Sequence, residues 1–181
     1  MKLGNYISII NGYPFKSNEF SFENSKYPVI KIKELKKNGI LLTKDTCFVK
    51  QSNDLSQYLL KKDDIIIALT GNPPTKGGIE AMVGRCCKYN LNIPAYMNQR
   101  ICKVFSSSDL LLNKYLYYFL SLDKTIMNLA QRCSGSANQA NISSNDIKDL
   151  DIYLPNIKLQ QHIVNIKRRH LCNINYLNFV M

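Results

Sequence analysis

The amino-acid sequence predicts an α+β protein, in which a mixed β-sheet or partly closed barrel packs against helices and a C-terminal helix of coiled-coil type follows. Three observations lead to this fold class. Strand-like segments come first and helix-like segments come later, and such grouping favours α+β over a doubly wound α/β sheet. Residues 65–70 form a continuous apolar run, which is typical of a strand buried on both faces. Residues 156–181 carry an apolar stripe near coiled-coil spacing.

The first half of the chain predicts a short helix and then strands. Residues 3–10 have apolar side chains at helical spacing, and Asn11-Gly12 is expected to end this helix. Residues 27–33 alternate in polarity, which predicts a strand with one buried face and one basic face. Further strands are expected at residues 46–50, 65–70, 82–89 and 100–105.

The second half of the chain predicts mainly helices. Residues 110–122 are apolar almost all round, which predicts a helix buried in the domain with Ser108 or Asp109 as its N-cap. A shorter helix is expected at residues 126–132.

A short junction joins these helices to the last one. Residues 134–143 are small and polar, which predicts a loop, and Asp146 suits the dipole of a short helical turn. A short apolar strand then leads to a proline, and Asn156 is expected to cap the final helix. The sequence therefore predicts a domain at residues 1–155 and a separate helix at residues 156–181.

The composition indicates an intracellular protein that binds polyanions. The chain has 24 Lys+Arg against 13 Asp+Glu, a formal net charge of +11. Such an excess attracts nucleic acid or anionic lipid, and the alternative is a general adjustment of solubility. The six cysteines show no C-x-x-C spacing, and no secretory signal or membrane span is apparent. We therefore expect a cytoplasmic protein with reduced, buried cysteines, no metal site and no membrane association.

Basic and amide side chains predict a surface for double-stranded DNA. Lysines contact phosphates, whereas the forked groups of Arg, Asn and Gln match the edges of bases. Each cluster alone is a weak signal, because solvated lysines and loop amides are common, but together with the net charge they favour DNA binding. The candidate contacts are Lys16, Lys31, Lys33, Asn72, Lys76, Arg85, Gln99, Arg100 and Gln139, with Asn72 and Gln139 as base-edge candidates.

The last helix carries an apolar stripe that needs a partner. Its members recur every three or four residues, close to the a/d seam of a coiled coil. The stripe either folds back on its own domain or packs on another chain, and its place after a complete domain favours another chain. The members are Leu159, Ile163, Ile166, His170, Ile174, Leu177 and Met181.

Catalytic motifs are weak in this sequence. Asn72-Pro73-Pro74 after a predicted strand resembles the catalytic loop of amino-group DNA methyltransferases, in which an aromatic residue follows. Here Thr75 takes that place, and no glycine-rich loop upstream is available for a nucleotide cofactor. A proline-stiffened surface loop is the simpler interpretation, and we expect no catalysis, no cofactor and no metal.

A set of short motifs follows a fixed order along nearly the whole chain. It includes a glycine-aromatic turn, an aspartate-led strand that ends in Thr-Gly, an Asn-Gln-Arg triplet and an aromatic helix. The matching segments are residues 3–17, 28–32, 63–71, 98–100, 115–120, 135–143, 154–155 and 160–164. In this order they resemble one half of the specificity (S) subunit of Type I restriction-modification systems.

This resemblance implies a non-catalytic target-recognition domain at residues 1–155 and a short spacer helix at residues 156–181. The implied partners are double-stranded DNA, a DNA methyltransferase (M) subunit and, in systems that have one, a restriction (R) subunit. Full-length family members have two recognition domains and two spacer helices, so a homodimer through the helix is expected to read a symmetric split site. The family's usual Gln-Pro-Asn reads Gln139-Ala140-Asn141 here, which alters the rigidity of that loop.

Two other interpretations stay open. One is an interaction module, a fragment of an S subunit that docks on methyltransferase subunits without reading DNA. The other is an independent methyltransferase that uses the loop at Asn72. DNA affinity that falls steeply with salt would favour the recognition domain, and cofactor binding would favour the methyltransferase.

Overall fold

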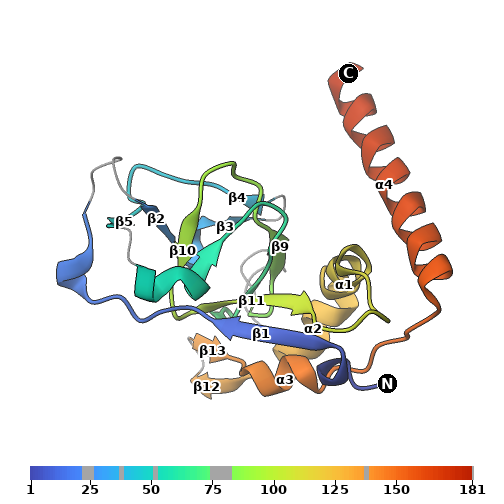
Figure 1. The fold of residues 1–181 in the computed structure, drawn as a ribbon, viewed down its shortest axis with the longest axis horizontal. Coiled ribbons are helices and arrows are strands. Elements are labelled where there is room, and N and C mark those ends of the chain that lie inside the picture. The colour runs from blue at the N-terminus through green and yellow to red at the C-terminus, as the bar shows by residue number, and fades with distance from the viewer. Residues whose placement is uncertain (22–26, 37–38, 51–52, 74–82, 137–138, 181) are drawn as a thin grey trace.

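The computed structural model describes residues 1–21, 27–36, 39–50, 53–73, 83–136 and 139–180. At residues 53, 135, 136, 139 and 170–180 the structure describes the backbone alone. The described part has a mixed α+β architecture with four sheets and four α-helices, which confirms the predicted class (Figure 1). No pairing among the described strands closes one of these sheets into a barrel.

A four-stranded antiparallel sheet in the order β1-β11-β7-β9 forms the centre of the molecule. Its strands are β1 (Ile7–Asn11), β11 (Ile101–Ser106), β7 (Ile65–Ala68) and β9 (Cys86–Lys88). All four residues of β7 are buried, and alternate residues belong to two different core clusters. The prediction of a strand buried on both faces is therefore confirmed.

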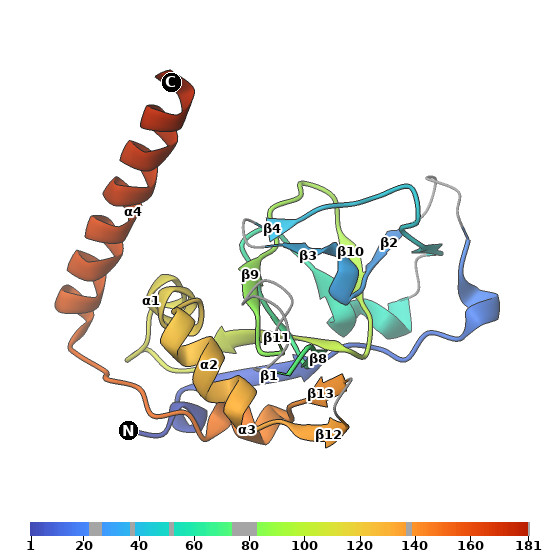
Figure 2. The same cartoon turned by 180° about the vertical axis from the view of Figure 1, so that it is seen from behind.

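Two cores lie on opposite faces of this sheet. The larger one, the helix-side core, packs the sheet against α1 (Asn113–Leu120) and α2 (Asp123–Gln131) through residues such as Leu116 and Leu129 (Figure 2). The smaller one, the strand-side core, packs the other face against a second sheet in the order β5-β2-β10-β6. The second sheet consists of β5 (Phe48–Val49), β2 (Tyr27–Ile30), β10 (Ala95–Met97) and β6 (Leu59–Leu60).

Short elements complete the domain around these layers. β3 (Leu35–Lys36) pairs with β4 (Gly39–Ile40), and β12 (Ser134–Ser136), β13 (Gln139–Asn141) and β8 (Thr70–Gly71) form a small third sheet. The 3-10 helices are η1 (Leu3–Asn5), η2 (Ser17–Glu19), η3 (Ile32–Glu34) and η4 (Asn53–Tyr58). The remaining α-helices are α3 (Ser144–Lys148) and α4 (Ile157–Val180).

The N-terminus lies beside the segment that leads into α4. The Leu3 amide donates to the Leu150 carbonyl at 2.9 Å, and the Ile152 amide donates to the Met1 carbonyl at 2.9 Å. Lys2 and Asp151 form an isolated bridge between the same two segments. The short apolar strand expected before Pro155 is thus a single bridge to the start of the chain.

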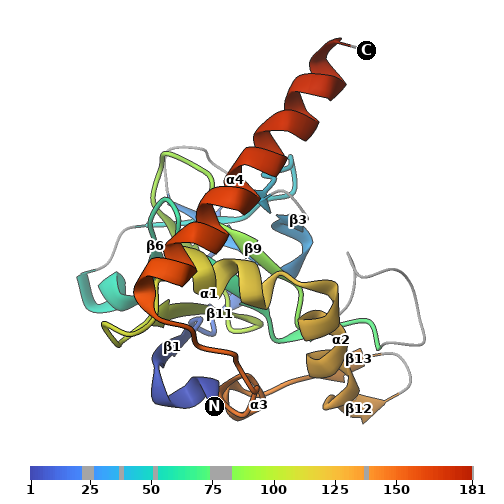
Figure 3. The same ribbon diagram turned by 90° about the vertical axis from the view of Figure 1, so that its right-hand side faces the viewer.

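α4 begins where the sequence predicts. The Leu159 amide donates to the Asn156 Oδ1 atom at 3.0 Å, so Asn156 caps the helix as expected. α4 then crosses α1 and extends beyond the rest of the molecule (Figure 3).

Four local predictions are wrong. The strand expected at residues 27–33 ends at Ile30 with both faces largely buried, and Ile32–Glu34 form η3. Residues 3–10 form η1 and then β1, because Ile7 and Ile9 pair with β11 and this pairing outweighs the helical spacing. Residues 134–143 contain the strands β12 and β13, because their small side chains accept extended backbone that pairs with β8. Leu112, and neither Ser108 nor Asp109, stands at the N-cap of the aromatic helix α1.

Candidate nucleic-acid interface

The loops at one end of the central sheet carry most of the predicted DNA contacts. We name this end, where β1 and β7 finish and β9 and β11 begin, the cleft end, and the opposite end the helix end. Lys16 follows β1, Asn72 follows β7 and β8, Arg85 precedes β9, and Gln99 and Arg100 precede β11. Antiparallel pairing therefore gathers residues from distant parts of the sequence at the cleft end.

A tightly fixed turn at residues 98–100 occupies the middle of the cleft end. The Asn98 amide donates to the Ile30 carbonyl at 3.0 Å, and the Arg100 carbonyl accepts from the Leu69 amide at 2.9 Å. The flanking residues of the turn are bonded to the segment after β1 through the amides of Gly12 and Tyr13, each at 2.9 Å. Backbone bonds to three other segments thus fix this turn, which carries the exposed side chains of Gln99 and Arg100.

Gly12 permits this arrangement because it has no side chain. A Cβ atom at this position would lie 2.0 Å from the Asn98 carbonyl oxygen, far inside any real contact distance. The segment after β1 therefore approaches the turn more closely than any other residue type at position 12 would allow.

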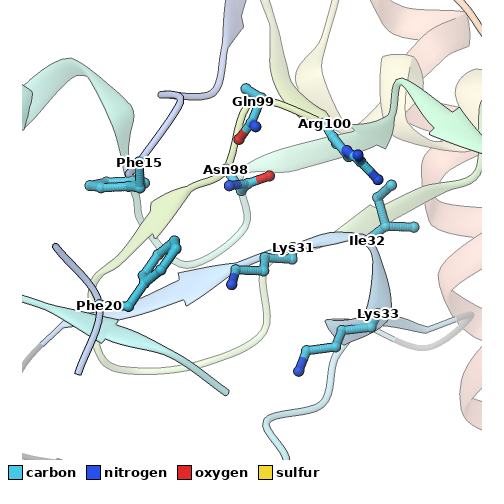
Figure 4. A pocket seen from close by; sticks show the side chains of 8 residues that line it. All are labelled: Phe15, Phe20, Lys31, Ile32, Lys33, Asn98, Gln99 and Arg100. Carbon is cyan, nitrogen blue, oxygen red and sulfur yellow. The ribbon is translucent and has the colours of Figure 1, made fainter. Parts of the chain in front are cut away.

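The turn forms one wall of a cleft of about 390 Å³. In Figure 4, Lys31 and Lys33 come from the wall opposite, and two phenylalanine rings stand at one side. The lining residues are Phe15, Phe20, Lys31, Ile32, Lys33, Asn98, Gln99 and Arg100. The structure therefore brings four predicted DNA contacts, Lys31, Lys33, Gln99 and Arg100, to one cleft.

The two lysines of the cleft are held by neighbouring groups. The Lys31 Nζ atom lies 4.0 Å from the centroid of the Phe20 ring and 3.1 Å from the Cys47 Sγ atom. The Lys33 Nζ atom donates to the Asp45 carbonyl at 2.7 Å. These contacts reduce the freedom of both ammonium groups, so that less side-chain entropy would be lost when a phosphate binds.

A buried carboxylate, Glu34, supports the segment that carries these lysines. It is 0% exposed, accepts from the Lys31 amide at 3.0 Å and lies 3.7 Å from the Lys33 Nζ atom. It also accepts from the Thr46 hydroxyl at 3.3 Å. Burial raises the pKa of Glu34 above its ordinary value of 4.5, although the hydrogen bonds and Lys33 act in the opposite direction.

The other predicted contacts lie outside the cleft. Arg85 is 8% exposed and its guanidinium donates to the Ile32 carbonyl at 3.0 Å, so it supports the lysine wall from inside the protein. Lys16 is exposed and precedes η2. Asn72 follows β8, and β8 pairs with β13, so the backbone of Gln139 lies near Asn72 in a second group at the cleft end. Lys76 lies outside the described residues.

Sequence reasoning did not identify Phe20 or Glu34 as parts of this site. Glu34 stands three residues after Lys31, which is the spacing of a capping box, and an acid among lysines could have drawn attention to it. The sequence around Phe20 does not predict its place in the cleft, because its contact with Lys31 depends on the tertiary fold.

The predicted partner helix is packed on the domain at its start. Ile163 contacts the helix-side core, whereas Leu159 and Ile166 are 41% and 44% exposed. His170, Ile174 and Leu177 lie on α4, but their side chains are outside the described part.

The described residues contain no group of three or more His, Cys, Asp or Glu side chains that could hold a metal ion. None of the helices searched among them is long and apolar enough to cross a bilayer. The four buried cysteines in the described part are free thiols, and burial raises the pKa of Cys87 and of Cys102 to about 12. Cys86, Cys87 and Cys102 belong to the two cores and therefore act as small apolar core residues.

A family model and a curated relative both match most of this chain, and they agree with each other. The family model of the Type I restriction modification DNA specificity domain matches residues 1–170. The Type I restriction enzyme EcoBI specificity subunit of Escherichia coli is 24% identical over 160 residues, which are 86% of this chain and 28% of that subunit.

Solved structures share the fold at low sequence identity. A chain from a study of assembly and conformational transition of the type I R-M system has a TM-score of 0.70 at 18% identity, over 99% of this chain and 40% of that one. The HsdS subunit from Thermoanaerobacter tengcongensis has a TM-score of 0.67 at 18% identity, over 100% and 39%. The Type-I S subunit from M. genitalium has a TM-score of 0.59 at 18% identity, over 99% and 41%. This chain thus spans less than half the length of each of these relatives.

Proposed function

The chain belongs to the family of Type I restriction-modification DNA specificity domains, and from this premise we propose that it binds double-stranded DNA sequence-specifically as a target-recognition domain. A specificity domain is the recognition part of its system and not its catalyst, in agreement with the prediction of a non-catalytic chain. Under this proposal, residues 1–155 read DNA and residues 156–181 form a spacer helix.

The observation that carries the proposal is the cleft. It combines two lysines that suit phosphates with Gln99 and Arg100, whose forked groups suit base edges. The fixed turn beneath Gln99 and Arg100 would allow them to meet DNA without an ordering cost for the backbone. The net charge of +11 adds long-range attraction to the phosphate backbone.

The second group of polar residues at the cleft end extends this surface. We propose that Asn72 and Gln139 approach base edges, and that Lys16 and Lys76 contact phosphates. Arg85 would act indirectly in this scheme, because its bond to the Ile32 carbonyl holds the wall from which Lys31 and Lys33 project.

We further propose that α4 pairs with α4 of a second copy in a coiled-coil arrangement. The exposed Leu159 and Ile166 lie on the predicted stripe, and a two-fold pair would present two recognition domains to a symmetric split site. A methyltransferase subunit, and a restriction subunit where the system has one, would then act at the site that the pair has bound.

A second candidate function is docking on methyltransferase subunits without reading DNA. The observation that favours it is the apolar surface at the helix end, where Leu110 and Tyr153 are 60% and 74% exposed. An independent methyltransferase has less support, because Thr75 stands where the catalytic loop of such enzymes carries an aromatic residue.

Selection from randomised duplexes, with and without the methyltransferase subunit, tests the proposal. A recognition domain should enrich one sequence, and its affinity should fall steeply as salt increases. The variant Gln99→Ala should relax one position of the enriched sequence, whereas Lys33→Ala should weaken all sequences alike. A chain that enriches no sequence but still binds the methyltransferase would overturn the proposal and support docking.

A further inference from the structure

The direction of α4 depends on a short contact with the domain. Its first turns pack on the domain near α1, where Val164 is 3% exposed, whereas residues 167–169 are exposed (Figure 3). A long helix that is anchored over so few turns is free to swing unless the anchor is directional, because apolar packing alone has little directionality.

Gln160 supplies a directional contact at this anchor. Its side chain is 0% exposed, although glutamine is mostly found on protein surfaces. Its Nε2 atom donates to the Leu110 carbonyl at 2.7 Å and to the Pro155 carbonyl at 2.8 Å. Its Oε1 atom accepts from the Leu112 amide at 2.9 Å.

These three bonds connect α4 to two pieces of backbone. Leu110 and Leu112 belong to the segment that leads from β11 into α1, and Pro155 ends the segment that leads into α4. The carboxamide is planar and uses both of its N–H donors and its carbonyl oxygen, so its partners constrain the rotation as well as the position of α4.

We infer that Gln160 is a positioning residue whose carboxamide fixes the direction in which α4 leaves the domain. The consequence of this role for DNA binding rests on the proposed function. If two domains are joined through α4, then the direction of α4 sets the separation of their clefts and therefore the number of base pairs between two half-sites.

Residual dipolar couplings of the full chain test the inference without DNA. In the wild type, couplings from the amides of residues 157–169 should fit the same alignment tensor as those from β1 and β11. In Gln160→Met, which keeps the volume and removes all three bonds, the helix couplings should shrink because α4 samples several directions. Exchange of the Leu112 amide should also accelerate by roughly tenfold.

Two matched controls separate positioning from a general structural role. Gln161→Met changes the exposed neighbour, which bonds to Asn165 at 3.1 Å, and should leave every coupling unchanged. Val164→Ala removes buried apolar contact and should lower the unfolding temperature, but it should keep a single tensor. Gln160→Asn, which shortens the side chain by one methylene, gives the same test if Gln160→Met does not fold.

Helix couplings that stay at their wild-type values in the folded Gln160 variants would overturn the inference. So would an equal loss of couplings in Val164→Ala, since the direction would then depend on packing. Selection from duplexes with two half-sites at varied spacing tests the consequence for DNA. Wild type should prefer one spacing and Gln160→Met should accept several. A wild type that selects no half-site would refute the proposed function, while the couplings would still decide the role of Gln160.

Discussion

The two ends of the central sheet differ in the groups that bond to the backbone and in the side chains that face solvent. At the cleft end, backbone groups bond to one another around the 98–100 turn, and polar side chains such as Gln99 and Arg100 face solvent. At the helix end, the side chain of Gln160 satisfies backbone groups, and apolar side chains such as Leu110 and Tyr153 face solvent. The first surface suits a polar, charged partner such as DNA, and the second suits an apolar protein surface. The polar and the apolar surface thus lie at opposite ends of one sheet.

The largest expected effect is at Gly12, on which the cleft end depends. In Gly12→Ala the new Cβ atom would meet the Asn98 oxygen at 2.0 Å, so the turn must move. We expect a loss of about 2–3 kcal/mol in the free energy of unfolding, measured by urea titration. Gly4→Ala is the comparison with milder crowding, since its new Cβ would meet the Lys148 Cβ atom at 2.8 Å and the Lys148 carbonyl oxygen at 3.2 Å. An equal or smaller loss for Gly12→Ala would show that the turn is not fixed in this way.

The second-largest expected effect is on pairing through α4, at the helix end. Ile166→Asp places a charge on an exposed apolar position of α4, and we expect pairing through α4 to weaken by tens of fold, about 2 kcal/mol. Sedimentation measures the dissociation constant, and urea titration should show an unchanged domain. Asn165→Asp introduces the same carboxylate at the adjacent exposed position and should leave pairing intact. Equal weakening by both variants would mean that charge on α4, and not its apolar stripe, governs pairing.

A smaller effect is expected at the lysines of the cleft. The double variant Lys31→Gln, Lys33→Gln should lower DNA affinity by about tenfold and reduce the slope of affinity against salt by about two. Fluorescence anisotropy over a range of salt concentrations measures both quantities. Lys61→Gln combined with Lys62→Gln removes two exposed charges near the helix end and should preserve the slope. If the slope of affinity against salt falls in the Lys61, Lys62 variant but not in the Lys31, Lys33 variant, then DNA binds at the helix end.

The smallest effect is the pH dependence from Glu34. Because burial raises the pKa of Glu34, the native state holds its proton to higher pH than the unfolded chain. Stability from this group should therefore fall as the pH rises from 4.5 through the raised value. Glu34→Gln should lack this fall, which urea titrations at several pH values can detect. Parallel pH profiles for the variant and the wild type would contradict the assignment to Glu34.

The sequence predicts those elements whose pattern is local. The apolar run of β7, the aromatic helix α1 and the cap at Asn156 each carry their own signal, and the structure places them as expected. β1 was mistaken for a helix because its spacing fits both, and its pairing with β11 lies far along the chain. β10 was missed because its three residues show no periodicity.

The site could be predicted by residue type but not by geometry. Basic residues on a predicted strand and amide and basic residues in loops indicated Lys31, Lys33, Gln99 and Arg100, which the fold brings to one cleft. The burial of Arg85 could not be read in the same way, because an arginine at a strand end looks the same whether it faces solvent or the carbonyl of Ile32. Side-chain direction in such loops is set by tertiary contacts.

The pairing of residues 1–3 with residues 150–152 has a consequence for how this domain can be joined to other chains. The backbone enters and leaves the domain at neighbouring points, which bonds such as Leu3 to Leu150 hold together. A unit of this form can be inserted into a host chain, joined in tandem or circularly permuted through a short linker without opening its core. The pairing of residues 1–3 with residues 150–152 therefore makes the domain modular. This property comes from the topology of the domain and not from any residue of its cleft.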